Sequence, residues 1–425
     1  MIWRGLLTLL LLAAAAAPAA AQTQKPGAKP PPPKVRVRWT NHPRIDIGDL
    51  RIDFRARVTA DVRKSEASFD EDELDRTVDL ARRRFGVEGQ FRNLVDFQIE
   101  RELGSGPVDP WRDVYINYRQ FEFANFRYGK FKLPFSLDEN TSSINLDFAY
   151  RSQIATHLAP GRDIGWMAHG RVLDRHIGYE FGVFEQDGDN ARTRNLERVS
   201  GGTTVAWRVS AQPLRSIESP YTDLHVAFAS TSSDVPEGFP ALQGDAVLGA
   251  RMFEADFWVL GKRKRTGLEF RWRPGPVSVK YESIRLTNER LGQGVEEDDL
   301  SPYEAKGWYF SGTYAITGER KADGLDDPKK PLFQGGAGAI EVAARVERIT
   351  FGTTAIGGDI STSPRADRYQ GNSNKVMTFG VNWYLNHWVK MQFNYIKESL
   401  TDPAQGPLPG QPSYTSRVFR FQFQF

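Results

Sequence analysis

Basic side chains recur at every second position in several segments of this 425-residue chain. In residues 50–63 the apolar side chains occupy one register, and the other register contains Arg51, Arg55, Arg57 and Arg63. The guanidinium group stays charged, is weakly hydrated and matches the oxygens of phosphate or carboxylate with paired donors. A row of such groups can pass an anion along, provided that no single site holds it too tightly. The spacing therefore points to anion binding or conduction, and it requires an element that turns these side chains to one face.

A period of two is the signature of a β-strand, in which successive side chains point to opposite faces. The alternation in residues 50–63 is longer than a usual soluble strand of about 5 or 6 residues, and it suits a tilted strand that crosses a bilayer. The chain ends in the same way, because its last polar residues alternate with Phe419, Phe421, Phe423 and Phe425. A lipid-facing surface would accept that row. A C-terminal aromatic residue also resembles the recognition signal of bacterial outer-membrane barrels.

Sixteen segments in all carry a strand pattern, and an even number is what a bacterial single-chain barrel requires. The other fourteen lie near residues 79–91, 93–103, 111–120, 123–132, 163–173, 176–186, 202–212, 222–231, 264–273, 276–287, 305–317, 338–350, 375–385 and 387–398. Short and long connections alternate, as periplasmic turns and external loops do; residues 318–337 are the exception, because they should be a turn and yet are long. We predict an all-β transmembrane antiparallel barrel of about 16 strands over residues 49–425.

The N-terminus predicts export to the Gram-negative outer membrane. Residues 1–21 have one early cation, Arg4, then a short apolar stretch and a small-residue cleavage site after Ala21, which is the pattern of a signal peptide. Residues 22–48 are interpreted as a Pro-rich periplasmic linker or tail.

The composition excludes several classes of protein. The absence of cysteine excludes disulfide scaffolds, thiolate zinc sites and cysteine nucleophiles. Beyond the extreme N-terminus there is no apolar run of about 18 residues, which a helical membrane protein needs. A net charge of +3 gives no strong attraction to nucleic acid. The six histidines show no metal spacing, and no Gly-rich loop follows a strand and opens a helix, so no metal and no cofactor are expected.

The polar register places a basic wall in the lumen of the predicted barrel, because in a large barrel the polar face lines water. Closure makes the last strand the neighbour of the first, so these cations fall on four adjacent strands. The predicted wall consists of Arg51, Arg55, Arg57, Arg63, Arg82, Arg84, Lys390 and Arg420. The remaining lumen carries both signs of charge, with acids such as Asp96, Glu100 and Asp113. A basic wall opposite a mixed wall suits the passage of small anions.

Two stretches, GKFKLPFSLDENTSS (129–143) and APGRDIGW (159–166), resemble the phosphate-selective porin O/P family. The later stretches TGER (317–320) and GAGAIEVAARVE (336–347) are also similar to it. The resemblance implies a trimeric 16-stranded outer-membrane channel with an arginine-lined wall and a long third loop folded into the pore. The Pro-rich tail is not part of this pattern.

The third loop then becomes the expected constriction and anion site, with Lys130, Lys132, Arg151 and Arg162 as its cations. The alternation does not fit this placement cleanly, because Phe126 and Tyr128 share a register with the two lysines. A bulge or the end of the strand would resolve the conflict. The two lysines are therefore assigned by the resemblance and not by their period.

These observations favour a passive outer-membrane channel with anion preference, for inorganic phosphate or other small anions. A general or differently selective porin without a phosphate site remains the alternative. A barrel enzyme is a remote one, because no Ser/His pair is clearly placed, and we expect no enzymatic activity. The expected partners are outer-membrane lipid, lipopolysaccharide and two further copies of the chain in a homotrimer. The basic run at residues 261–265 suits either anions at the mouth or lipopolysaccharide phosphates.

Overall fold

A computed structural model describes residues 34–67, 79–104, 109–190, 202–219, 221–240, 243–254 and 256–425. The predicted signal peptide and the proline run of the predicted linker lie outside these residues. No helix within the described ranges is long and apolar enough to span a membrane.

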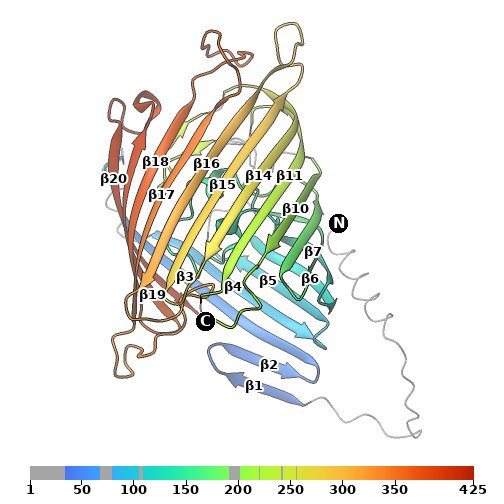
Figure 1. Ribbon diagram of the computed structural model, residues 1–425, viewed down its shortest axis with the longest axis vertical. Coiled ribbons are helices and arrows are strands. Elements are labelled where there is room, and N and C mark those ends of the chain that lie inside the picture. The colour runs from blue at the N-terminus through green and yellow to red at the C-terminus, as the bar shows by residue number, and fades with distance from the viewer. Residues whose placement is uncertain are drawn as a thin grey trace, which may run out of the picture.

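The described residues contain sixteen antiparallel strands that close into one barrel (Figure 1). The strands are β3 (Leu50–Ser65), β4 (Asp79–Phe91), β5 (Val95–Glu102), β6 (Trp111–Phe121), β7 (Ala124–Lys132), β8 (Arg162–Val172), β9 (Ile177–Phe184), β10 (Thr204–Ala211), β11 (Leu224–Gly238), β14 (Val259–Trp272), β15 (Val277–Arg290), β16 (Leu300–Ala315), β17 (Ala339–Thr353), β18 (Asn372–Tyr384), β19 (Val389–Leu400) and β20 (Ser413–Gln424). Each strand pairs with the next along the chain, and β20 pairs with β3, where Phe419 lies opposite Val62. The predicted transmembrane barrel is confirmed.

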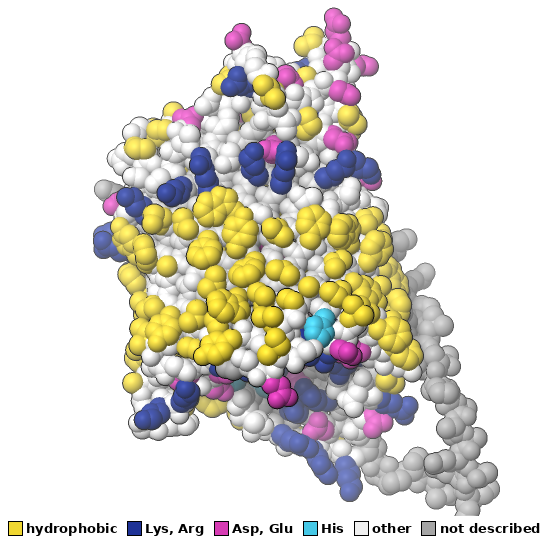
Figure 2. Space-filling model, viewed as in Figure 1, with side chains coloured by type: hydrophobic (Ala, Val, Ile, Leu, Met, Phe, Trp, Pro, Cys, Tyr) yellow, Lys and Arg dark blue, Asp and Glu magenta, His cyan; other side chains and the backbone are white. Residues whose placement is uncertain are grey.

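The face of the barrel seen in Figure 2 carries an apolar belt, with charged side chains above and below it. On β20, Phe419 and Phe423 are exposed on the outer surface, whereas the alternating residues Arg420 and Gln422 are buried toward the lumen. This is the alternation expected where one face of each strand meets lipid and the other faces the interior.

A short hairpin precedes the barrel and changes the predicted boundary of the linker. Strands β1 (Val35–Trp39) and β2 (Pro43–Ile47) pair with each other, and β2 continues onto β3, with Ile45 opposite Ile52. The hairpin hangs below the barrel wall in Figure 1. The sheet thus begins at Val35, within the range 22–48 that we interpreted as linker.

The long loop between β7 and β8, residues 133–161, makes hydrogen bonds with inward-facing side chains of distant strands. It contains two short helices, α3 (Leu137–Asn140) and α4 (Gln153–His157). Glu282 of β15 accepts from the backbone N–H of Leu137, at 3.1 Å. Glu347 of β17 accepts from the N–H of Gln153, at 2.6 Å. These bonds satisfy the backbone donors that a helix leaves open at its first turn, and so they fix the loop against the wall.

Apolar packing holds the same loop. Phe135, Ile154 and Leu158 are fully buried in one cluster with wall residues of β11 and β14–β17. Glycines on the wall leave room for them: a Cβ at Gly267 would lie 3.2 Å from the ring of Phe135. The loop and the strands that it packs against therefore share one hydrophobic cluster.

The loop between β11 and β14 adds one more small element. Strands β12 (Gly244–Asp245) and β13 (Arg251–Phe253) form a separate two-stranded sheet there. A single 3-10 turn, η1 (Pro403–Gln405), follows β19. Neither element carries a residue of the predicted site.

Candidate pore and anion site

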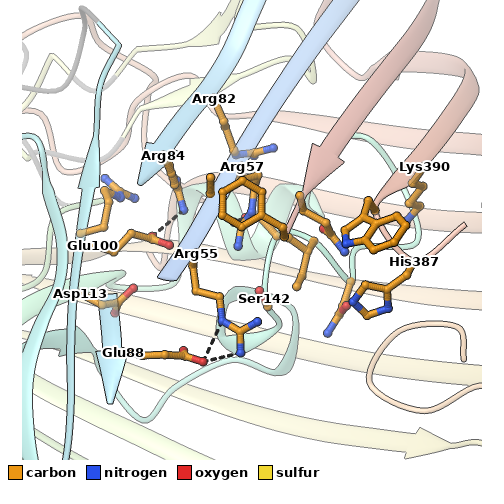
Figure 3. A pocket seen from close by; sticks show the side chains of 18 of the residues that line it. Arg55, Arg57, Arg82, Arg84, Glu88, Glu100, Asp113, Ser142, His387 and Lys390 are labelled. Carbon is orange, nitrogen blue, oxygen red and sulfur yellow. Dashed lines mark hydrogen bonds and ion pairs between the residues drawn. The ribbon is translucent and has the colours of Figure 1, made fainter. Parts of the chain in front are cut away.

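A cavity of about 780 Å³ lies between the wall formed by β3–β6 and the loop 133–161. Residues 325–328 of a turn and residues 386–390 of another complete its lining (Figure 3). Cationic side chains outnumber acidic ones in that lining. The cations are Arg55, Arg57, Arg82, Arg84, Arg112, Lys132, Arg151, Arg162 and Lys390, and the acids are Glu88, Glu100, Asp113, Glu139, Asp326 and Asp327.

The predicted basic wall divides into two groups. Arg55, Arg57, Arg82, Arg84 and Lys390 line the cavity, as the alternation of their strands requires. The other three residues do not line it.

Each of those three has an acidic partner elsewhere. Arg51 binds Asp53 at 2.7 Å, and Arg63 binds Asp79 at 2.8 Å, both with exposed side chains. Arg420 is buried, binds Asp61 at 2.6 Å and also donates to the carbonyl of Ala149 in the long loop. Its contacts therefore brace the loop.

Two arginines of the cavity are neutralised by acids on neighbouring strands (Figure 3). Arg55 binds Glu88 at 2.5 Å. Arg84 binds Glu102 at 2.8 Å and Glu100 at 3.3 Å. The acids that we placed on a separate mixed wall, such as Glu100, thus lie in the same cavity as the arginines. The basic and acidic groups form neighbouring pairs here, not two opposed walls.

Arg57 and Arg82 have no carboxylate partner among the described residues. Arg57 donates one hydrogen bond to the hydroxyl of Ser143, and its Nε is unsatisfied. Arg82 makes no side-chain hydrogen bond within the described part of the chain, and its buried Nη1 is unsatisfied. The charges that act most strongly on Arg82 are also cations, including Arg84 and Arg57. A buried donor without a partner is costly, so these two arginines differ from Arg55 and Arg84 in having unused hydrogen-bond donors.

The predicted loop cations are only partly brought together. Lys132, Arg151 and Arg162 line the cavity, and Lys130 does not. Lys130 instead binds Asp109 at 2.5 Å, in the loop before β6. The pairing of β7 with β8 passes through both lysines without a register shift, so no bulge separates them from Phe126 and Tyr128. Lys132 is the last residue of β7, so the end of the strand accounts for its position.

Glu139 acts as a clamp for two of these cations. It binds Arg151 at 3.2 Å and Lys132 at 3.6 Å. Both cations also donate to the carbonyl of Thr141, Arg151 at 2.7 Å. Burial alone would raise the pKa of Glu139, but the positive charges of Arg151 and Lys132 outweigh it and leave the pKa below its usual value. The clamp is therefore ionised at neutral pH and holds the loop to β7.

The remaining predicted loop cation, Arg162, is also paired. It binds Asp113 at 2.9 Å through two guanidinium nitrogens, in a geometry typical of an arginine–carboxylate fork. Arg112, which the sequence interpretation left out, lies in the same cavity with Asp189 at 3.6 Å. The pairing of β5 with β6 shifts register between Ile99 and Arg101, opposite the start of β6. Strict alternation therefore does not predict which face of the sheet the side chain of Arg112 occupies.

The unusually long turn 316–338 also contributes to the cavity. Its residues Asp326 and Asp327 are part of the lining. The ammonium of Lys321 lies 2.6 Å from Asp147 of the long loop and 2.5 Å from Glu341 of β17. Lys321 is fully buried, and although burial lowers its pKa, the two acids raise it above the usual value. The unusual length of this turn was visible in the sequence. In the structure the turn contacts the long loop through Lys321 and Asp147.

The basic run at residues 261–265 lies within β14. Arg263 and Arg265 are buried and both bind Asp187, at 2.6 and 2.5 Å. Burial raises the pKa of Asp187, but the two arginines lower it more, to about 2. These arginines are neutralised inside the barrel and do not face the mouth. No group of His, Asp and Glu that could hold a metal occurs among the described residues.

The sequence of the chain matches a known protein family. The profile of the family described as phosphate-selective porin O and P matches residues 52–233 and 241–425. Porin O of Pseudomonas aeruginosa is 31% identical over 326 residues, which cover 71% of each chain.

Solved structures agree on the fold alone. The outer membrane channel DcaP of Acinetobacter baumannii has a TM-score of 0.55 at 8% identity and covers 88% of this chain and 97% of its own. Outer-membrane expressed OmpT of Vibrio cholerae has a TM-score of 0.54 at 11% identity and covers 89% and 99%. With the family profile matching nearly the whole barrel, the chain belongs to the phosphate-selective porin O and P family, and it is an outer-membrane porin and not an enzyme.

Proposed function

We propose that this porin is a passive channel with anion preference and that phosphate or a related oxyanion is its favoured solute. The observation that carries the proposal is the pair Arg57 and Arg82, two cavity arginines with no carboxylate partner among the described residues. The description of the family as phosphate-selective supports the choice of solute.

The paired and the unpaired arginines have different roles in this proposal. In Arg55 and Arg84 the donors are occupied by Glu88 and by Glu100 and Glu102, so their charge is locally cancelled. Arg57 and Arg82 keep donors and charge for a passing ion. Low-dielectric walls concentrate the field of such groups where water is scarce, and a multivalent anion gains more from that field than chloride does.

The loop 133–161 narrows the passage in this proposal. Its residues Ser143 and Arg151 lie on the cavity side opposite β3 and β4, and Ser143 accepts a hydrogen bond from Arg57. Lys132 and Arg151 hold the loop in place through Glu139, and Arg162 at the start of β8 is paired with Asp113 of β6. They add positive charge near the site, but their donors are engaged with protein groups.

The test is the reversal potential of the channel in planar bilayers across a potassium chloride gradient. The parent is expected to prefer chloride, and Arg57→Gln/Arg82→Gln is expected to lose most of that preference. The control Arg51→Gln/Arg63→Gln removes the same charge from side chains outside the cavity and should keep the parental value. The proposal would be contradicted if the parent channel preferred cations, or if the double variant kept the parental selectivity.

Titration with phosphate then distinguishes a channel that favours phosphate from a general porin. Phosphate added to chloride should block single-channel current in the parent at low concentration, and less so in the double variant. A parent in which phosphate only replaces chloride as a carrier, without block, favours the general porin.

We also propose that the protein assembles as a homotrimer, exported by the signal peptide 1–21, as the family resemblance implies. That resemblance alone supports the proposal. Mass photometry after extraction in mild detergent tests it, and a monomer there counts against it.

A further inference from the structure

A row of outward-facing cations runs along the outer surface of the barrel across seven consecutive strands. It consists of Arg285, Lys306, Arg348, Lys375, Lys397, Arg417 and Lys64, one on each strand from β15 through β20 to β3, all of them exposed. We refer to these seven residues as the cation row. Figure 2 shows dark blue side chains in such a line just above the apolar belt.

The sheet register makes the row continuous. Three pairs lie directly opposite each other: Arg285 with Lys306, Arg348 with Lys375, and Lys64 with Arg417. At the other three steps the cations are diagonal neighbours. Each cation there lies two residues from the residue that pairs directly with the preceding cation of the row. Like charges directly opposite on a sheet are destabilising, so the row needs an anionic counterpart.

The protein supplies little of that counterpart. Glu304 binds both Arg285 and Lys306, the latter at 2.6 Å. Among the described residues, the side chain of Arg348 donates a hydrogen bond only to the hydroxyl of Ser373, at 2.9 Å. Lys375 and Arg417 have no ion pair within the described part of the chain, and the same holds for Lys397 and Lys64. A positive excess therefore remains on the outer surface.

The position of the row identifies its surroundings. On β16, β18 and β20 the next outward residue toward the end with short turns is apolar: Trp308, Met377 and Phe419, all exposed. The cations thus mark the edge of the apolar belt on the side of the long external loops, where the headgroups of the outer leaflet lie. Cationic side chains at this level face lipid phosphates, since these carry the negative charge at that depth.

A groove below the row suits the tail of the same lipid. Its volume is about 620 Å³, and its walls include Phe228, Leu268 and Trp308. Three members of the row, Arg285, Lys306 and Arg348, line it as well. Charge at one end and apolar surface along the rest match a lipid that has phosphates on its headgroup and acyl chains beneath.

We propose that the cation row and this groove form a binding site for the phosphorylated, multiply acylated lipid of the outer leaflet, the lipid A part of lipopolysaccharide. The phosphates lie against Arg348, Lys375 and Arg417, and an acyl chain lies in the groove beside Trp308. The site is independent of the pore, because none of its residues lines the cavity. In this proposal the outer surface from β15 through β20 to β3 contacts lipid.

The test measures lipid binding to the detergent-solubilised full chain by native mass spectrometry. The lipids are diphosphorylated lipid A and the same lipid after removal of its phosphates. The variant Arg348→Gln/Lys375→Gln/Arg417→Gln removes row cations that have no acidic partner. A matched control, Arg92→Gln/Arg171→Gln/Arg215→Gln, removes three exposed cations near the short turns at the other end of the barrel.

Diphosphorylated lipid A should bind the row variant at least about tenfold more weakly than the parent, because three cations that face the lipid phosphates are removed. The control should bind like the parent, and inorganic phosphate should not displace the lipid. Parental affinity in the row variant, equal binding of the dephosphorylated lipid, or displacement by inorganic phosphate would each overturn the proposal.

Folding and pore function need separate readouts. Heat-dependent migration on gels reports whether the barrel is intact, and single-channel conductance should stay parental in the row variant. If the triple variant does not fold, the conservative variant Arg348→Lys/Arg417→Lys and the single variant Lys375→Gln replace it. The first should keep lipid A binding and the second should weaken it; the opposite pattern counts against the site.

Discussion

Arg57 and Arg84 lie directly opposite each other on β3 and β4, yet only Arg84 has carboxylate partners. The strand order explains the difference. On its far side β4 pairs with β5, which places Glu102 opposite Arg84. On its far side β3 pairs with β20, which places the neutral Gln424 opposite Arg57. The closure of the barrel therefore gives Arg57 a neutral cross-strand neighbour, and no carboxylate pairs with it among the described residues.

This relationship gives a prediction about phosphate affinity. Arg57→Gln should weaken phosphate block of chloride current by about tenfold, or ~1.4 kcal/mol, because free donors contact the ion directly. Arg84→Gln should have a smaller effect, since its guanidinium donors are already occupied by Glu100 and Glu102. The measurement is the concentration of phosphate that halves single-channel current. Equal effects of the two variants would show that only overall charge matters.

The alternation placed four arginines of β3 and β4 on one face, but it did not predict which of them lack a carboxylate partner. The period of two places Arg55, Arg57, Arg82 and Arg84 on one face, and all four line the cavity. Their neutralisation depends on cross-strand register, which a single strand's pattern does not contain. The same limit applied to Arg420, which the alternation turned inward correctly but whose partners, Asp61 and Ala149, come from another strand and the loop.

The clamp at Glu139 leads to a prediction about loop order. Glu139→Gln leaves the buried cations Lys132 and Arg151 without their carboxylate, and breaking a buried pair costs roughly 3–5 kcal/mol. We expect larger fluctuations of the open-channel current, because the loop is then free to move. Current noise in planar bilayers is the measurement. Asp138→Asn is the matched control, since Asp138 is the neighbouring acid and no ion pair involving it occurs within the described residues.

The pH dependence of this clamp follows from its pKa. The folded pKa of Glu139 lies below its usual value of 4.5, so the ionised clamp contributes stability above that value and loses it as pH falls through the folded pKa. The parent should therefore show constant noise from pH 6 to about 5 and higher noise in stronger acid. The Glu139→Gln variant should be noisy throughout this range. A rise in parental noise between pH 6 and 5 would mean that another group holds the loop.

The packing of the loop against glycine gives a third prediction. Gly267→Val should push the ring of Phe135 away, because a Cβ there already lies 3.2 Å from that ring. The displaced loop should raise conductance in high salt and weaken phosphate block. Gly312→Val is the control, since the nearest atom to a Cβ at Gly312 is 3.8 Å away. Unchanged conductance in Gly267→Val would indicate that the loop does not limit the current.

The loop contacts themselves could not be read from the sequence. Helices α3 and α4 are only four and five residues long, and their stability comes from caps such as Ser136 and from the wall residue Glu282. The resemblance indicated a loop that enters the pore, but partners such as Glu282 for Leu137 and Glu347 for Gln153 lie on strands more than a hundred positions away. The length of the turn 318–337 was a visible anomaly, although its reason lies in Asp147.

That turn carries the last prediction. The buried ammonium of Lys321 joins Asp147 of the loop to Glu341 of the wall, so Lys321→Gln removes the charge that balances two acids. Asp147 keeps Lys280, at 2.7 Å, whereas Glu341 keeps only neutral donors such as Asn382. The turn should then detach, and because Asp326 and Asp327 line the cavity, conductance and its fluctuations should change together. Lys330→Gln, an exposed cation of the same turn, should behave as the parent does. Parental current in Lys321→Gln would mean that the turn stays in place without this link.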